Sequence, residues 1–132
     1  MTDLYHRKIF SFDCDIYGHL NNAAYLNIYE EARSILLDKV GHSLQDTHKQ
    51  GIFLYLTNID ITFKKEVKLG ATVEVKTKAL ETSRVRFHWY QEIFDEAGNL
   101  CNTASIKGAF VKAGKPWRIP PTMLEDLKKL EA

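Results

Sequence analysis

Residues 22–40 read NAAYLNIYEEARSILLDKV and carry the strongest periodic pattern in the chain. Apolar side chains recur there at intervals of three and four, which places them on one face of an α-helix. The residues on this apolar face are Tyr25, Ile28, Tyr29, Ala32, Ile35, Leu36 and Val40. Polar residues fall largely on the opposite face, which predicts that they point into solvent. They are Asn27, Glu30, Glu31, Arg33, Asp38 and Lys39.

Both ends of this helix carry residues that are typical of helix termini. Asn21 or Asn22 is expected to cap the amino end, because a short amide oxygen accepts a hydrogen bond from an unpaired helical N–H. Gly41 follows the last apolar residue, where helices commonly end in the left-handed conformation. At about 1.5 Å per residue the helix would extend about 28 Å. That is long for a chain of 132 residues, so we expect it to be the central element.

Strand patterns lie on both sides of the helix. Residues 7–12 form a short alternating segment before it, and a polar stretch at 42–51 follows it. Alternation then returns in segments separated by short turns, at 55–64, 73–77, 84–93 and 100–112. Short connections join antiparallel neighbours. The order predicts an α+β domain over residues 1–132, with one long central helix on an antiparallel sheet of about five strands and a short terminal helix at 123–130.

Composition excludes several classes of protein. The 18 Lys and Arg residues exceed the 17 Asp and Glu residues by one, and a near-neutral chain argues against a nucleic-acid or membrane-surface binder. With 45% hydrophobic residues, intrinsic disorder is not expected. No apolar run approaches the roughly 20 residues that span a bilayer, and residues 1–8 contain no apolar signal core. Cys14 and Cys101 show neither disulfide nor zinc spacing, so a cytoplasmic domain is expected.

The segment DCDIYGHLNN at 13–22 places reactive groups on the loop that leads into the helix. The helix amino end carries unpaired N–H groups and a partial positive charge, which would polarise a carbonyl and stabilise its oxyanion without a metal. Asp15 is ionised at neutral pH and could attack that carbonyl or deprotonate a water. His19 and Gly18 lie on the same loop. These groups are the ones that acyl transfer to water requires.

The same residues also have an ordinary structural interpretation. Asp, Gly and Asn before a helix are common turn and cap residues, and His19 alone is more often structural than catalytic. Cys14 is a poor nucleophile candidate, because Asp13 and Asp15 disfavour its thiolate. A metal site from these two carboxylates and His19 is weak, because no further ligand has a recognisable spacing. On residue chemistry alone, both interpretations stay open.

A family resemblance changes this balance. The stretch FDCDIYGHLNNAAYL at 12–26, which runs into EEAR at 30–33, resembles the 4-hydroxybenzoyl-CoA thioesterase family of hotdog-fold acyl-CoA thioesterases. The likeness continues through ITFKKEVKLGATVEV at 61–75 and covers nearly the whole chain. Further matching segments are SRVRF at 83–87, GKP at 114–116 and RIP at 118–120. One departure is Glu66, where many members have proline.

The resemblance implies an acyl-CoA thioesterase that hydrolyses its substrate without a metal or cofactor. By this resemblance, Asp15 matches the catalytic aspartate, as nucleophile or general base, and the backbone N–H of Asn22 polarises the thioester carbonyl. Gly18 and His19 match the family's Gly-His pair. Arg84 matches a position that contacts CoA phosphates in some relatives.

The resemblance also implies a homodimer or homotetramer with the acyl pocket between subunits. A physical reason points the same way, because one helix on one sheet leaves exposed strand edges and apolar surface. Tyr17 and Tyr25 are expected to line the acyl pocket or to pack the core, together with Phe53 and Tyr55. Two alternatives remain at this point: a hotdog enoyl-CoA hydratase and a non-catalytic acyl-CoA-binding protein.

Overall fold

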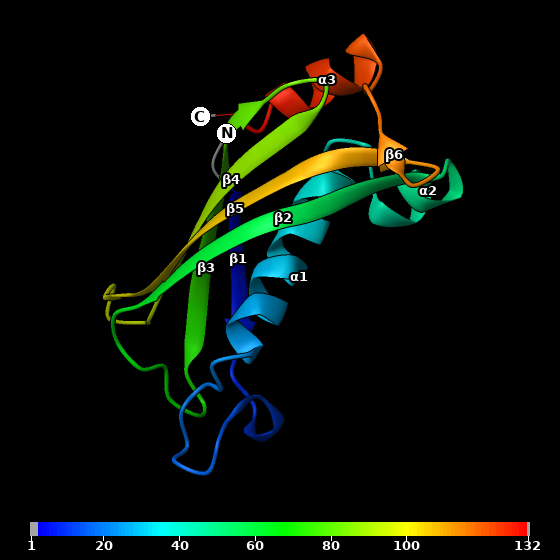
Figure 1. Ribbon diagram of the computed structural model, residues 1–132. Coiled ribbons are helices and arrows are strands. Elements are labelled where there is room, and N and C mark those ends of the chain that lie inside the picture. The colour runs from blue at the N-terminus through cyan, green and yellow to red at the C-terminus, as the bar shows by residue number, and fades with distance from the viewer. Residues whose placement is uncertain (1–2, 132) are drawn as a thin grey trace.

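The computed structural model describes residues 3–131. The chain forms five long strands, one short strand and three α-helices within this range (Figure 1). In order, they are β1 (Asp3–Lys8), α1 (Ala24–Lys39), α2 (Leu44–Lys49), β2 (Ile52–Phe63), β3 (Thr72–Thr82), β4 (Arg86–Phe94), β5 (Leu100–Lys112), β6 (Lys115–Pro116) and α3 (Pro121–Lys128). A single 3₁₀ turn, Ser11–Asp13, follows β1. Within the described part of the chain, none of the helices combines the length and apolarity needed to cross a bilayer.

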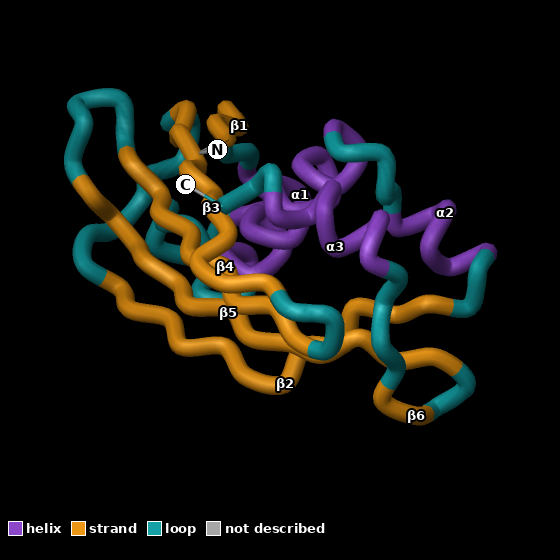
Figure 2. Tube along the Cα trace, turned by 90° about the horizontal axis from the view of Figure 1, so that it is seen from above, coloured by secondary structure: helices purple, strands orange, loops and turns teal. Residues whose placement is uncertain are grey.

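The strands form one antiparallel sheet with the order β1-β3-β4-β5-β2, and β6 extends it beside β5. The sheet curves, and α1 lies along its concave face (Figures 1 and 2). β-Bulges shift the register between Leu56 and Asn58 in β2 and between Ala79 and Glu81 in β3, and such bulges increase local twist. This arrangement confirms the expected α+β hotdog fold, with a long helix wrapped by an antiparallel sheet.

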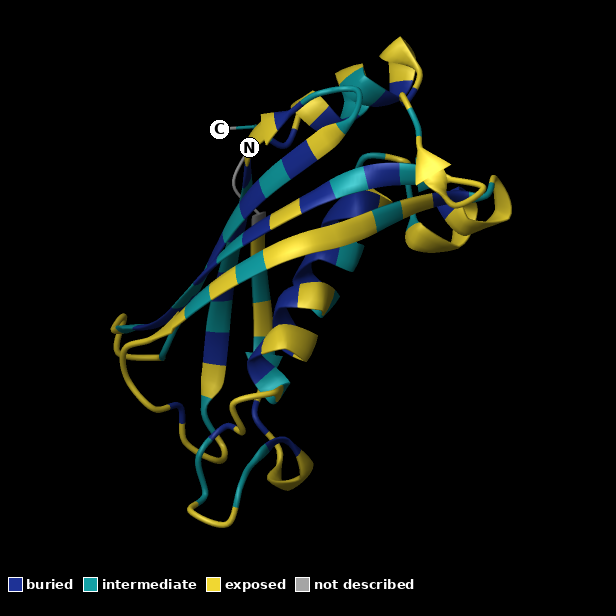
Figure 3. Cartoon of the chain, in the orientation of Figure 1, coloured by how far each residue is buried: buried dark blue, intermediate teal, exposed yellow. Residues whose placement is uncertain are grey.

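The core lies between α1 and the concave face of the sheet (Figure 3). Ile28, Tyr29 and Leu36 of the predicted apolar face are fully buried, whereas Ile35 and Val40 are half-buried. Alternate residues of β3 and β4 meet the helix, which gives both strands a strict two-residue burial pattern over most of their length. Burial of this helix face therefore fixes where its amino end lies relative to the sheet.

Several predicted boundaries are wrong in detail. β1 begins and ends earlier than the predicted 7–12 segment, and α2 lies within the polar stretch at 42–51, for which no helix was predicted. The predicted cap of α1 is also wrong. The N-cap residue is Ala23, which makes no side-chain cap, while the Asn21 side chain accepts a hydrogen bond from the Ala23 N–H at 2.9 Å. Asn21 therefore stabilises the turn before the helix and does not cap the helix itself.

Arg33 contradicts the expectation that the polar face of the helix points into solvent. It is only 8% exposed, and its Nη1 donates to Gln91 Oε1 at 2.8 Å. Gln91 in turn donates to the Tyr29 carbonyl at 3.0 Å and to Thr77 Oγ1 at 2.9 Å. Burial lowers the pKa of the Arg33 guanidinium from its usual value. The helix pattern missed this residue because its partner Gln91 comes from a distant strand.

Gly108 provides a test of the packing between β5 and its neighbours. A Cβ on this glycine would overlap with Cζ of the Phe87 ring and would lie 2.6 Å from the carbonyl oxygen of Tyr55, which is backbone and cannot rotate away. We expect Gly108→Ala to lower the free energy of unfolding by about 3 kcal/mol, measured by urea denaturation. The adjacent Ala109→Ser is the control and should change stability by less than about 1 kcal/mol. Equal stability of the two variants would contradict this packing.

Candidate active site

Asp15 organises the tight loop before α1. Its Oδ1 accepts hydrogen bonds from the N–H of Tyr17 at 2.9 Å and from that of His19 at 3.3 Å. Gly18 donates its N–H to the Asp15 carbonyl and adopts φ +75°, a conformation that side-chain-bearing residues rarely reach. Among residues 3–131, no hydrogen-bond donor contacts the second carboxylate oxygen, Oδ2. One oxygen of Asp15 therefore holds the loop while the other remains available.

The loop packs against the chain segment between β2 and β3. Leu20 donates its N–H to the Val67 carbonyl at 2.7 Å, and Leu69 donates to the Gly18 carbonyl at 2.9 Å. His19 also forms an isolated bridge with Lys68. Residues nearly 50 positions apart are thereby fixed beside each other at the amino end of α1.

These two segments enclose an open depression of about 480 Å³. The sequence-predicted Asp15, His19, Asn22 and Tyr25 all line it, so the structure brings four of the seven predicted site residues together. The remaining lining residues are Leu20, Phe63, Lys64, Lys65 and Glu66. The Tyr25 ring is buried and meets the ring of Phe63 edge to face at 5.2 Å, which forms an aromatic wall. Burial raises the pKa of the Tyr25 phenol, so this side chain stays neutral.

The backbone N–H of Asn22 is unused within the described part of the chain. Neighbouring amides are occupied, since the Asn21 N–H donates to the Asp13 carbonyl and the Ala24 N–H to the Asn21 carbonyl, both at 2.9 Å. Asn22 itself is exposed and lies two residues before the first residue of α1. An unpaired amide at the positive end of a helix dipole is suited to bind a carbonyl oxygen that gains negative charge.

His19 has a carboxylate neighbour that the sequence did not suggest. Its Nε2 lies 4.0 Å from Glu66 Oε1, and the two side chains are 37% and 54% exposed. Pairs this open to water contribute little to stability. Both residues nevertheless line the depression. The His19 side chain therefore belongs to the site and not to the core.

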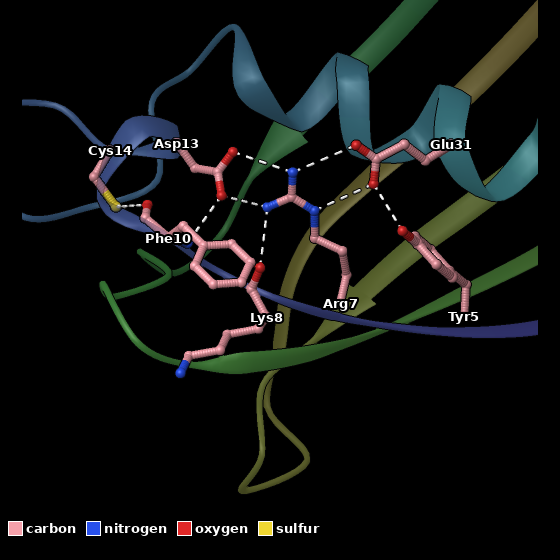
Figure 4. Close-up of polar contacts among 7 residues, drawn as sticks. All are labelled: Tyr5, Arg7, Lys8, Phe10, Asp13, Cys14 and Glu31. Carbon is pink, nitrogen blue, oxygen red and sulfur yellow. Dashed lines mark hydrogen bonds and ion pairs between the residues drawn. The ribbon is translucent and has the colours of Figure 1, made fainter.

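A network of charged side chains ties the start of the loop to β1 and α1 (Figure 4). Arg7 of β1 lies between two carboxylates: it binds Asp13 through both terminal nitrogens, and its Nε donates to Glu31 of α1 at 3.2 Å. The Phe10 N–H also donates to Asp13, at 2.9 Å, and the Tyr5 hydroxyl donates to Glu31 at 2.8 Å. Arg7 thus joins β1, the 3₁₀ turn and α1, and its partner Asp13 is two residues before Asp15 in the chain.

Three predicted site residues lie outside the depression. Tyr17 is 76% exposed at the tip of the loop, so it neither packs the core nor lines this depression. Gly18 forms the turn. Arg84 lies at the β3–β4 turn, at the opposite end of the sheet (Figure 1), where its Nε donates to the Ile119 carbonyl at 2.8 Å. Arg84 therefore holds the segment that leads to α3, and no contact joins it to Asp15 within this protomer.

Sequence reasoning missed the contribution of residues 63–66. Lys64 and Lys65 read as solvated charges, and Lys65 indeed pairs with Asp95 at 3.2 Å on the surface. Their place beside Asp15 depends on the end of β2, nearly 50 residues later in the chain. In the sequence, only the family resemblance at 61–75 pointed to this segment. That resemblance does not say where the segment lies relative to Asp15.

The structure supports the exclusion of Cys14 as a nucleophile. Burial and then the charges of Asp13 and Asp15 raise the pKa of its thiol. No cluster of three metal-ligating side chains occurs among residues 3–131, and Asp13 is committed to Arg7.

Comparison with known proteins identifies the family. A model described as the thioesterase-like superfamily matches residues 12–127, which includes the loop, the long helix and all strands from β2 onward. The chain belongs to this superfamily. It is a thioester hydrolase of the hotdog type, which confirms the fold and enzyme class expected from the sequence.

Individual relatives of this thioesterase agree with that assignment. An Aquifex aeolicus protein named as an esterase is 29% identical over 128 residues, which cover 97% of this chain and 99% of the relative. A betainyl-CoA thioesterase from Pseudomonas aeruginosa is 34% identical over 80 residues, covering 61% of this chain and 50% of that enzyme. A solved structure of DHNA-CoA thioesterase from Staphylococcus aureus superposes with a TM-score of 0.90 at 29% identity, over 97% of this chain and 89% of that one.

The Arg7–Asp13 pair makes a pH-dependent contribution to stability. Burial alone would raise the pKa of Asp13, but the hydrogen bonds from Arg7 and the Phe10 N–H outweigh it and lower the pKa. A carboxyl group with a lowered pKa stabilises the fold above its unfolded pKa, about 3.9, and loses that contribution as the pH falls through the folded value.

We expect Asp13→Asn to reduce the free energy of unfolding of this thioesterase by about 2–4 kcal/mol at pH 7, measured by urea denaturation. The difference from the wild type should begin to shrink below about pH 4, where the unfolded chain takes up the proton, and should become small once the pH is below the lowered folded-state pKa of Asp13. Asp38→Asn removes an exposed carboxylate and should shift stability by only about 0.5 kcal/mol. A loss at Asp13 that did not vary with pH would contradict the ion-pair explanation.

Proposed function

We propose that this chain, as a single thioesterase domain over residues 1–132, hydrolyses acyl-CoA thioesters to a carboxylic acid and free CoA without a metal. The observation that carries the proposal is the shared depression at the start of α1, which Asp15 and Asn22 both line and where Asp15 Oδ2 and the Asn22 N–H have no hydrogen-bond partner among the described residues. The betainyl-CoA and DHNA-CoA activities named for two relatives supply the acyl-CoA class of substrate.

In this mechanism the thioester carbonyl oxygen accepts the Asn22 N–H. Asp15 then acts through Oδ2, either by taking a proton from water as the water oxygen attacks the carbonyl carbon, or by attacking that carbon itself. The tetrahedral intermediate carries its negative charge on the oxygen held by Asn22 and the helix amino end. Its collapse breaks the carbon–sulfur bond, and the CoA thiolate leaves and takes up a proton. In the second route, water hydrolyses the resulting anhydride and restores Asp15.

His19 and Glu66 have supporting roles in the proposal. Both stand on the rim of the depression, and His19 also donates its backbone N–H to Asp15 Oδ1. We assign His19 the positioning of the catalytic loop and of water. The rings of Tyr25 and Phe63 form the wall that the first carbons of the acyl group would contact.

The depression is open, and we propose that a second copy of the chain closes it. β2 is an edge strand of the sheet, with Phe53 44%, Tyr55 63% and Leu56 37% exposed. It runs from Ile52 at one end of the sheet to Phe63 in the depression. If two β2 edges pair antiparallel about a twofold axis, the end of β2 in one copy lies beside the start of β2 in the other. Each depression then lies beside the end of the partner's sheet where β2 begins.

This pairing also gives Arg84 a place in the site. Arg86, Ala109 and Tyr55 pair across neighbouring strands, so the β3–β4 turn lies level with the start of β2. Antiparallel pairing of the β2 edges therefore brings this turn of the partner to the side of the assembly that holds Asp15. A phosphate group of CoA, bound at that turn, would then span from one subunit to the active site of the other.

Asp15→Asn tests the catalytic assignment. The amide cannot accept a proton from water or attack as an anion, yet it retains an oxygen that can hold the loop N–H groups. We expect kcat for acyl-CoA hydrolysis to fall about 10²–10⁴-fold with KM changed less than about threefold, measured by release of the CoA thiol. Asp46→Asn, on the exposed surface of α2, should retain full activity. A variant at Asp15 with normal kcat would remove this residue from its role.

The proposed assembly is tested by sedimentation equilibrium. We expect the wild type to have two or four times the protomer mass. Tyr55→Lys places charge on the β2 edge, which blocks edge-to-edge pairing, and should shift the protein toward monomer and reduce its activity on dilution. Leu4→Lys makes the same change on β1, at the other edge, where Leu4 is 48% exposed, and should keep the assembly intact. A fully active wild-type monomer would refute this arrangement.

A further inference from the structure

His19 and Glu66 bring an imidazole and a carboxylate together in the depression that Asp15 lines. The His19 Nε2 lies 4.0 Å from Glu66 Oε1, and all three residues line the same space. Among residues 3–131, Glu66 provides the one carboxylate within 4.0 Å of this imidazole. Hydrolysis at Asp15 also requires a proton at the departing sulfur, and an imidazole is a group that can supply one.

Backbone contacts fix where these two side chains stand. The Asp15 N–H donates to the His19 carbonyl at 2.9 Å, and the His19 N–H donates to Asp15 Oδ1 at 3.3 Å. The Leu20 N–H donates to the Val67 carbonyl at 2.7 Å, so the residues that follow His19 and Glu66 are bonded to each other. The geometry of the pair therefore does not depend on two free side chains alone.

The pair stands on the open side of the depression. The side chains of His19 and Glu66 are 37% and 54% exposed, whereas Tyr25 is 3% exposed. The acyl carbons of the substrate would contact the buried Tyr25, and the large, water-soluble CoA half would extend outward. Because the sulfur atom joins these two halves, it lies toward the open side, where the imidazole and the carboxylate stand.

Other ionisable side chains line the depression or pair with His19. They are Asp15, Tyr25, Lys64, Lys65 and Lys68. Lys65 is paired with Asp95 at 3.2 Å, and burial raises the pKa of the Tyr25 phenol, which makes it a poor proton donor. The Lys64 side chain makes no ion pair among residues 3–131, but an ammonium group releases its proton less readily than an imidazolium. His19 is therefore the best-suited acid in the depression.

We propose that His19, besides positioning the loop, protonates the departing CoA sulfur, and that Glu66 positions its imidazole and balances its charge. The inference rests on the proposed thioesterase function and assigns one further step of it. Asp15 takes a proton from water as the water oxygen bonds to the carbonyl carbon. The carbon–sulfur bond then breaks, and His19 gives an N–H proton to the sulfur. Asp15 afterwards loses its proton to water and His19 takes one up, which restores both groups.

The separation of His19 and Glu66 suits these two roles. At 4.0 Å the carboxylate attracts a charged imidazole, but it does not hold the N–H in a hydrogen bond, which needs about 3.2 Å or less. A charged imidazole carries a proton on both ring nitrogens. The Nε2 proton therefore remains free for a sulfur atom that enters the depression. Glu66 acts through His19, so it is a positioning residue.

The test uses one acyl group that the wild type hydrolyses, such as hexanoyl, on two leaving thiols: hexanoyl-CoA and S-(4-nitrophenyl) hexanethioate. The nitrophenyl thiolate is a weak base that departs without a proton, whereas the alkyl thiolate of CoA is a stronger base. For His19→Gln we expect kcat to fall about 10²-fold with hexanoyl-CoA and less than about threefold with the aryl ester. Glu66→Gln should lower kcat about tenfold with hexanoyl-CoA and less than about twofold with the aryl ester.

Three further measurements separate this role from a general change in the loop. Lys64→Gln removes the other cation of the depression that lacks an ion pair, and it should keep the wild-type ratio of the two kcat values. Glu125→Gln, on the exposed face of α3, should keep both kcat values. Because His19 and Glu66 are open to water, their variants should unfold within about 1 kcal/mol of the wild type in urea, which shows that each variant is folded.

The outcomes separate this inference from the proposed function. Equal losses with both esters in His19→Gln overturn the inference, because a displaced loop slows both reactions. A ratio that changes in Lys64→Gln and not in His19→Gln assigns the proton to Lys64 and also overturns it. An unchanged ratio in Glu66→Gln removes Glu66 from its role. Each of these results leaves the thioesterase in place, whereas a wild type that hydrolyses no acyl-CoA refutes the proposed function and the inference with it.

Discussion

The burial of one face of α1 against a sheet that curves around it sets the position of every other part of this enzyme. Tyr29, Ile28 and Leu36 are removed from water only if the helix lies along the concave face, and the alternating side chains of β3 and β4 receive it there. A helix held along its length has a fixed amino end. The dipole and the unpaired amide of Asn22 are therefore presented at one place, where the loop from Asp13 to Leu20 meets the end of β2.

Charge pairs and hydrogen bonds then fix the loop at that place. Arg7 ties the 3₁₀ turn to α1 through Asp13 and Glu31, and Asp15 closes the next turn with one carboxylate oxygen. Two neighbouring aspartates thus have different tasks, because one accepts a guanidinium and the other accepts only loop amides. The first is structural, and the second keeps one oxygen unpaired, which the proposed mechanism uses. Their environments, and not their residue type, separate these roles.

The same fold leaves two features that a lone protomer does not satisfy. The β2 edge exposes aromatic and aliphatic side chains beside an open depression, and the Arg33 guanidinium is buried with a hydrogen bond to the neutral Gln91. Both features face the side of the molecule where α1 and β2 approach each other. The proposed second subunit would meet the molecule on this side, along the strand edge.

The sequence by itself determined the element types, because periodicities of 3.6 and 2 follow directly from which residues must be buried. It also identified the loop with Asp15, His19 and Asn22, because carboxylate, imidazole and amide stood together before a helix. It did not determine that Arg33 is buried, that Asp13 belongs to Arg7, or that residues 63–66 complete the depression. Arg7 and Asp13 are only six residues apart, but the other facts depend on contacts between segments about 50 to 60 residues apart. Only the tertiary structure decides such contacts, because the free energy of a polar side chain depends on the partner that packing brings to it.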